Sequence, residues 1–198
     1  MSNLKKFKNK KIAIYGGSFN PIHIGHLLTG YDVLEKLCYD YILYIPANIP
    51  VHKDFKDGID GKLRLEMVKL ATKEYEKFLY SDIEIKRGGL TYTYDTVKEL
   101  QQKFGFTEKF GVIFGDDLLE GLDTWKNISE LEKMTELICL KRDKDIEHFS
   151  KYKVKFVENR IFNITSSEIR ERVKKNQPIN YFMTNTVKNF IIKNKLYY

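Results

Sequence analysis

The residues best suited to chemistry lie in one short stretch, YGGSFNPIHIGH, which spans residues 15–26. Its two glycines follow a strand-like run and let backbone amides approach an anion closely. Two histidines three positions apart stand where a helix should begin, and a helix N-terminus adds oriented N–H groups and partial positive charge. The serine hydroxyl and the imidazoles can donate further hydrogen bonds. The stretch therefore predicts a phosphate-binding site made of Gly16, Gly17, Ser18, His23 and His26.

Three other interpretations of this stretch fit less well. The dinucleotide fingerprint G-x-G-x-x-G is not matched, and Pro21 interrupts the expected helix start. The phosphate loop G-x-x-x-x-G-K-[ST] occurs nowhere in the chain. Zinc would need a third and a fourth ligand beside His23 and His26. The remaining histidines, His52 and His148, stand in a loop-like and a charged segment, so the pattern disfavours a histidine-held metal.

Strand-like runs alternate with helical periodicity along the chain. The strands and helices that these patterns predict must position the phosphate-binding residues. The predicted strands span residues 11–17, 41–47, 80–86, 110–115, 136–142 and 154–159. Such alternation predicts a Rossmann-like, doubly wound parallel sheet with helices on both faces. We expect a single domain over residues 1–198, with a helical tail from about residue 164. Ligands of such sheets bind beyond the carboxyl ends of the strands, where the opening stretch begins.

Composition and charge narrow the class of protein. The chain has 198 residues, a 42% apolar fraction and a net charge of +7, which suits an anionic partner. No stripe of basic residues interleaved with aromatic ones favours nucleic acid. No segment is typical of a signal peptide or a membrane span, so we expect a cytoplasmic protein. Cys38 and Cys139 lie in apolar periodic runs, which predicts buried free thiols in a reducing compartment.

Several further motifs follow the first one along the chain. A loop rich in proline and glycine over residues 46–61 contains PANIPVHK, with Lys53 near its centre. TYTYDT covers residues 91–96, and Gly115-Asp116-Asp117 precedes Trp125, the only tryptophan. ITSSEIR covers residues 164–170, and the chain ends in NKLYY. Together with GGSFNPIHIGH, these motifs resemble the nucleotidylyltransferase superfamily in its nicotinate mononucleotide adenylyltransferase form.

The resemblance implies a function and a set of roles. It implies adenylyl transfer from ATP to nicotinate mononucleotide, giving deamido-NAD and pyrophosphate, with Mg²⁺ accompanying ATP. The catalytic residues would be Ser18, His23, His26, Lys53 and Arg170. ATP would contact Gly16, Gly17, Ser18, His23, His26, Gly115, Asp117, Ser166 and Arg170, and the nicotinate nucleotide would contact Lys53, Thr93 and Trp125. The loop 46–61 would close over the substrates. A homo-oligomer is compatible with the resemblance.

The chain departs from the family pattern at three positions. Ser18 replaces a threonine and keeps the hydroxyl, whereas Asn20 replaces an aspartate and loses a charge. Val51 replaces the second proline of the loop, which leaves the conformation of that loop open.

Several alternatives stay open from sequence. Trp125 could be a core anchor rather than a platform for the pyridine ring, and Thr165 with Glu168 matches a capping box that could do no more than start a helix. A related transferase acting on phosphopantetheine, glycerol phosphate or a flavin would share the first motif but has no reason to carry both TYTYDT and Trp125. A basic nucleic-acid-binding protein is the alternative outside enzymes.

Overall fold

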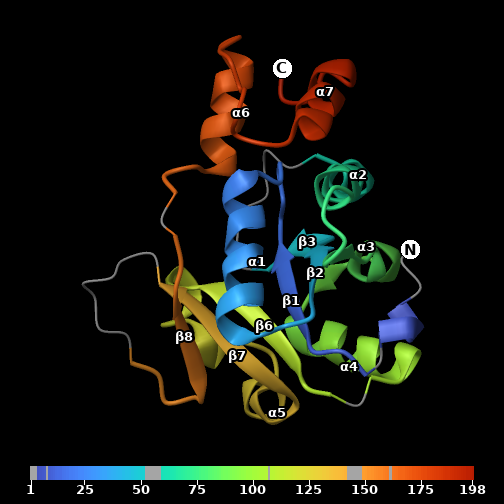
Figure 1. Cartoon of the computed structure of the whole chain (residues 1–198), viewed down its shortest axis with the longest axis vertical. Helices are drawn as coiled ribbons and strands as arrows, with labels where there is room; N and C mark the ends of the chain where they lie inside the picture. The colour runs from blue at the N-terminus through green and yellow to red at the C-terminus, as the bar shows by residue number, and fades with distance from the viewer. Residues whose placement is uncertain (1–3, 8, 52–58, 107, 142–148, 161) are drawn as a thin grey trace.

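A parallel sheet forms the centre of the computed structural model, which describes residues 4–7, 9–51, 59–106, 108–141, 149–160 and 162–198. Within these residues the sheet has six strands in the order β4-β2-β1-β6-β7-β8 (Figure 1). Their bounds are β1 Ile12–Gly17, β2 Tyr41–Pro46, β4 Phe78–Tyr80, β6 Phe110–Gly115, β7 Thr135–Lys141 and β8 Val154–Glu158. Every pair of neighbours is parallel, which confirms the predicted doubly wound sheet.

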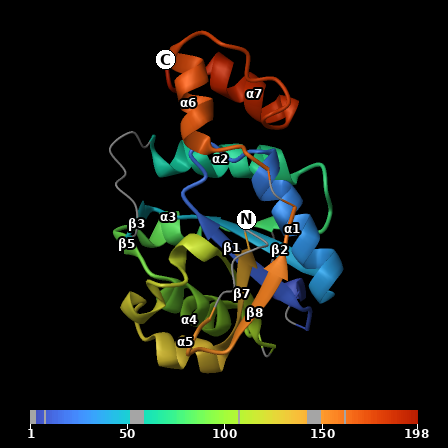
Figure 2. The same cartoon turned by 90° about the vertical axis from the view of Figure 1, so that its left-hand side faces the viewer.

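Helices cover both faces of this sheet, as predicted. One core joins the sheet to α1 (Ile24–Leu37) and α2 (Gly61–Thr72), and the tail helices α6 (Ser166–Lys174) and α7 (Asn185–Lys193) extend it. The other core contains α3 (Ile83–Arg87), α4 (Thr93–Phe104) and α5 (Ile128–Met134). Strand residues alternate between the two cores, since Ala13 belongs to the first and its neighbours Ile12 and Ile14 to the second. Figure 2 shows α6 and α7 together at one end of the molecule.

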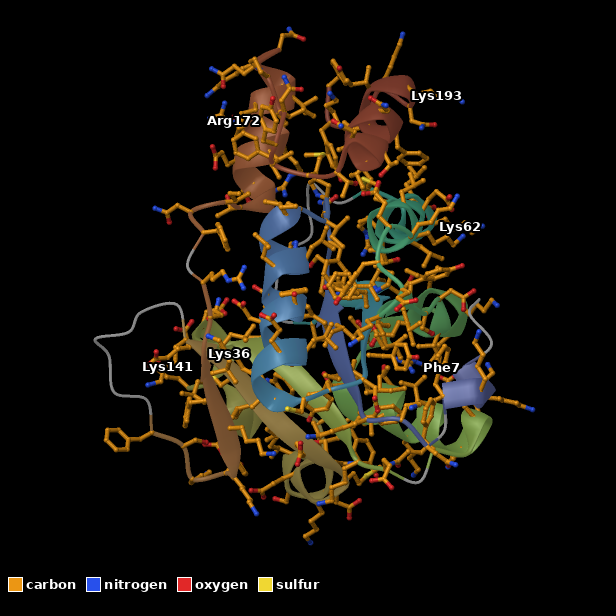
Figure 3. All side chains as sticks on the ribbon, viewed as in Figure 1. Phe7, Lys36, Lys62, Lys141, Arg172 and Lys193 are labelled. Atoms are coloured by element: carbon orange, nitrogen blue, oxygen red, sulfur yellow. The ribbon has the colours of Figure 1, made fainter. Side chains whose placement is uncertain are left out.

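Side chains cap the first turns of α2 and α6, and the sequence predicts the cap of α6. The Asp60 carboxylate accepts a hydrogen bond from the Lys62 amide at the start of α2 (2.6 Å). The Thr165 hydroxyl accepts one from the Glu168 amide at the start of α6 (3.1 Å). The Glu168 carboxylate does not complete a capping box but pairs with Arg172, one turn further along α6 (3.0 Å). Figure 3 labels Arg172 on this helix.

The predicted strand over residues 80–86 is wrong. Its pairing ends at Tyr80, and residues 83–87 form the short helix α3. The Ser81 hydroxyl accepts a hydrogen bond from the Ile83 amide, and Gly88 ends the helix with a positive φ of 72°. Alternation over a run this short fits either conformation, so periodicity alone does not decide between them.

Two smaller expectations also need correction. Cys139 is buried, but Cys38 is exposed. Cys38 ends α1 in the left-handed conformation (φ 53°), and its side chain leaves the apolar face there. The segment 46–61 is not wholly irregular, because β3 (Ile49–Pro50) pairs with β5 (Leu90–Thr91), and residues 52–58 lie outside the described residues. None of the described helices is long and apolar enough to cross a membrane.

Candidate active site

A cleft of about 590 Å³ opens where β1 and β6 end. These two neighbours are the topological switch point, because the chain runs outward from β1 through β2 to β4 and then crosses back to β6. Residues predicted for the site line the cleft from both halves of the chain, namely Gly16, Gly17, Ser18, His26, Thr93, Gly115, Asp117, Trp125, Ser166 and Arg170. His23 lies beside them, stacked on His26, and Lys53 is outside the described residues.

The two histidines at the start of α1 form one unit. The His23 amide donates a hydrogen bond to His26 Nδ1 (3.2 Å), and the ring centroids lie 3.7 Å apart. In the neutral His26 ring, Nδ1 is then the acceptor and Nε2 carries the proton. Because His26 lines the cleft, its N–H can serve as a donor for an anionic ligand.

Within this pair, His23 is the buried member and is not among the residues that line the cleft. Its side chain is buried, with 7% exposed, and burial lowers its pKa to about 4. The ring is therefore neutral at physiological pH. A Cβ on Gly25 would lie 3.0 Å from His23 Nδ1, so the glycine leaves room for this ring. The structure thus places Gly25 against His23, where a larger residue would crowd the imidazole.

The start of α6 is fastened to the first motif by hydrogen bonds. Ser166 Oγ donates to the carbonyl of Pro21 (2.9 Å), and Arg170 Nη1 donates to the carbonyl of Asn20 (3.0 Å). The Asn20–Pro21 peptide bond is cis. These contacts join positions about 150 residues apart and bring the Arg170 guanidinium to the cleft that His26 lines. Ser18 and His26 from the first motif and Ser166 and Arg170 from α6 therefore form one polar side of the cleft, called the polar wall below.

A second part of the cleft contains Thr93, Phe114 and Trp125. Thr93 is the first residue of α4, and Trp125 packs edge-on against Phe114 with ring centroids 5.5 Å apart. Trp125 is only 9% exposed, yet it lines the cleft and a smaller adjoining pocket of about 40 Å³. Trp125 is thus a core residue that also borders the cleft, and its role as a platform for the pyridine ring stays a prediction.

Two charged side chains of the site, those of Lys126 and Glu84, were not assigned a role from sequence. Lys126 lines the smaller pocket, and its Nζ pairs with Asp95 Oδ2 at the start of α4 (2.8 Å). Glu84 lines the main cleft with 7% of its surface exposed and accepts a hydrogen bond from the Thr96 hydroxyl (2.6 Å). Burial raises the pKa of Glu84 to about 7, although Thr96 and Arg87 favour the ionised form. No sequence signal marks Glu84, because the expected strand would turn it outward between Ile83 and Ile85.

Oxygen-rich metal sites are not a feature of the described part of the chain. Within it, no group of three or more histidine, cysteine, aspartate or glutamate side chains could hold a metal ion. The polar groups that the cleft does present, such as the Ser18 hydroxyl, the His26 imidazole and the Arg170 guanidinium, can donate hydrogen bonds to phosphate oxygens.

The Rossmann-like fold, the cleft at the switch point and the hydrogen-bond donors that line this cleft are those of a protein that binds a phosphorylated nucleotide. Residues 14–172 match the cytidylyltransferase-like family, and the chain belongs to that family. The resemblance drawn from its motifs is thereby confirmed.

Relatives carry a more particular name. The probable nicotinate-nucleotide adenylyltransferase of Borrelia hermsii is 37% identical over 187 residues, which cover 94% of this chain and 97% of the relative. The protein of the same name from Bacillus licheniformis is 39% identical over 188 residues, covering 95% and 98%. A solved structure of Plasmodium falciparum nicotinic acid mononucleotide adenylyltransferase complexed with NaAD shares the fold. Its TM-score is 0.75, with 24% identity over 95% of this chain and 97% of the other.

Proposed function

We infer that this protein is an enzyme of NAD biosynthesis that transfers the adenylyl group of ATP to nicotinate mononucleotide. The products are deamido-NAD and pyrophosphate. The observation that carries this function is the single cleft in which His26 and Arg170 face the same space as Thr93 and Trp125. The names of relatives that match nearly the whole chain support the same activity.

The reaction needs positioning and charge stabilisation rather than a base. An oxygen of the acceptor's 5′-phosphate forms a bond to the α-phosphorus of ATP while the bond to pyrophosphate breaks. The attacking oxygen is already an anion, so no proton has to be removed. Catalysis then depends on holding the two phosphates in line and stabilising the charge that develops on the α-phosphoryl group and the departing pyrophosphate.

The polar wall of the cleft supplies the donors for that task. We propose that His26 donates from Nε2 to the α-phosphoryl oxygens, since its Nδ1 is occupied by the His23 amide. Ser18 and Arg170 would bind the triphosphate, with Ser166, Gly115 and Asp117 beside the ATP. The neutral His23 ring would support His26 by stacking. Lys53, which lies outside the described residues, keeps its predicted role on the phosphates.

The acceptor would occupy the aromatic part of the cleft. Its pyridine ring would stack on Trp125, and the amide of Thr93 would donate to its carboxylate. The backbone just after Trp125, where Lys126 stands, would add a further donor. A site made of N–H donors suits a carboxylate better than a carboxamide, whose NH₂ group is itself a donor.

We propose that Mg²⁺ enters with ATP. The cleft fits this arrangement, because Ser18, His26 and Arg170 can donate to phosphate oxygens, whereas among its described lining residues only Glu84 and Asp117 carry the carboxylate ligands that Mg²⁺ prefers. The Asp117 carboxylate, which lines the cleft, would take part in holding the ion. When bound, Mg²⁺ would neutralise charge on the phosphates.

A cytoplasmic location suits an enzyme that uses ATP and a mononucleotide.

Pyrophosphate release measured across a panel of acceptors tests this function. With ATP and Mg²⁺, we expect turnover with nicotinate mononucleotide and little with phosphopantetheine, glycerol 3-phosphate or flavin mononucleotide. His26→Ala serves as the control for a contaminating activity. Turnover confined to one of the other acceptors would overturn the assignment. Salt-sensitive binding of DNA or RNA, with no pyrophosphate release, would favour the nucleic-acid-binding alternative.

A further inference from the structure

The last residues of the chain return to the phosphate-binding motif. Tyr197 Oη donates a hydrogen bond to Asn20 Oδ1 (2.8 Å) across 177 positions of sequence. The tail reaches this point by a sharp turn after α7, in which Lys195 and Tyr197 adopt positive φ values of 49° and 67°. In Figures 1 and 2 the C-terminus lies at the same end of the molecule as α6 and α7. Tyr198, the neighbouring residue, is 64% exposed.

Tyr197 remains a hydrogen-bond donor over the pH range of interest. Burial raises the pKa of its phenol well above the ordinary value, although Arg170 and Arg64 both favour the ionised form. The neutral phenol therefore faces a neutral amide oxygen, and the contact adds no negative charge beside the site where a triphosphate would bind.

The backbone conformation of residues 18–21, which Tyr197 contacts through Asn20, is held by side chains from other parts of the chain. Phe19 is buried and adopts a left-handed backbone (φ 46°), which is unfavourable for a residue with a large side chain. Arg64, fully buried on α2, donates to the carbonyl of Ser18 on one side of Phe19 (2.7 Å). Arg170 holds the backbone carbonyl of Asn20 on the other side. The side chain of Asn20 is held from the tail, by Tyr197.

We propose that Tyr197 is a positioning residue that acts through Asn20 to keep the Ser18–Pro21 segment in the conformation that binds the triphosphate of ATP. This inference rests on the proposed function for the identity of the nucleotide. Tyr197 lies behind the segment rather than among the residues that line the cleft, so its effect on ATP reaches the ligand through Asn20 and Ser18.

Tyr197→Phe removes only the hydroxyl, and Tyr198→Phe makes the same change at an exposed position. The dissociation constant of ATP with Mg²⁺ is measured by calorimetry, together with kcat/KM for ATP and the midpoint of thermal unfolding. We expect Tyr197→Phe to weaken ATP binding and to lower kcat/KM for ATP by about three- to tenfold, the value of one buried hydrogen bond. KM for the acceptor should stay within about twofold, and Tyr198→Phe should match the wild type.

A double-mutant cycle separates this role from a general loss of stability. In an Asn20→Ala background, Tyr197→Phe should have no further effect on ATP affinity, because the two residues act as one unit. Independent, multiplying losses would overturn the inference, as would an unchanged ATP affinity in Tyr197→Phe. If the wild type binds ATP and makes no deamido-NAD while the cycle behaves as expected, the proposed function fails and the positioning role stands. If turnover is normal and Tyr197→Phe leaves ATP affinity unaffected, the positioning role fails and the proposed function stands.

Discussion

Replacing Glu84 by glutamine should stabilise the protein at alkaline pH and leave it nearly unchanged in acid. Glu84 is buried in the cleft, and burial raises its pKa from the ordinary 4.5 to about 7. The folded protein thus holds a proton that the unfolded chain releases at lower pH. The stabilising contribution of this proton is complete below pH 4.5 and is lost as pH rises through about 7.

The size of the effect follows from the pKa difference. Each tenfold change in proton affinity is worth about 1.4 kcal/mol, so a pKa moved from 4.5 to about 7 corresponds to about 3 kcal/mol. Glutamine keeps an oxygen that can accept the Thr96 hydroxyl and does not ionise. We therefore expect Glu84→Gln to exceed the wild type in free energy of unfolding by up to about 3 kcal/mol at pH 8.5.

Urea unfolding at pH 4.5 and pH 8.5 measures this difference. The matched control is Glu66→Gln, because Glu66 is a partly exposed acid on α2 whose partner is Lys69. That variant should show no comparable gain at pH 8.5. A Glu84→Gln protein that is less stable than the wild type at pH 8.5 would refute the reasoning. It would mean that Arg87 and Arg64 stabilise an ionised Glu84 in the folded protein.

Further predictions concern the two histidines, the tryptophan and the acceptor. His26→Ala should lower kcat by about 10²- to 10³-fold with an unchanged fold by circular dichroism, and near-native turnover would contradict its role. As pH falls from 6.5 to 4, His23→Gln should gain about 3 kcal/mol in free energy of unfolding relative to the wild type, because the pKa of His23 is about 4 in the fold, and the opposite contribution of Glu84 is common to both proteins and cancels. Trp125→Ala should raise KM for both pyridine mononucleotides in steady-state kinetics, leave KM for ATP nearly unchanged and cost about 3 kcal/mol of stability in urea unfolding. The wild-type kcat/KM should favour nicotinate over nicotinamide mononucleotide by at least about tenfold, and equal efficiencies would argue against a carboxylate-selective site.

Features that depend on neighbouring residues were predictable from sequence. His23 and His26 are three positions apart, so a helix beginning there brings the two rings together whatever the rest of the chain does. Asp60 and Thr165 cap their helices through amides two or three residues on. The alternation of strands and helices restricted the fold to a doubly wound sheet, and in such a sheet the end of β1 is a ligand site by topology.

Features that depend on distant partners were decided only by the tertiary structure. Glu84 enters the cleft because α3 replaces the end of a predicted strand, and a run of five residues carries too little pattern to tell these conformations apart. Lys126 meets Asp95 through packing between segments 31 residues apart. Tyr197 meets Asn20 because α6 and α7 pack on the same core as α1. Local hydrogen bonding and periodicity act over a few residues, whereas these contacts are fixed by how whole elements pack.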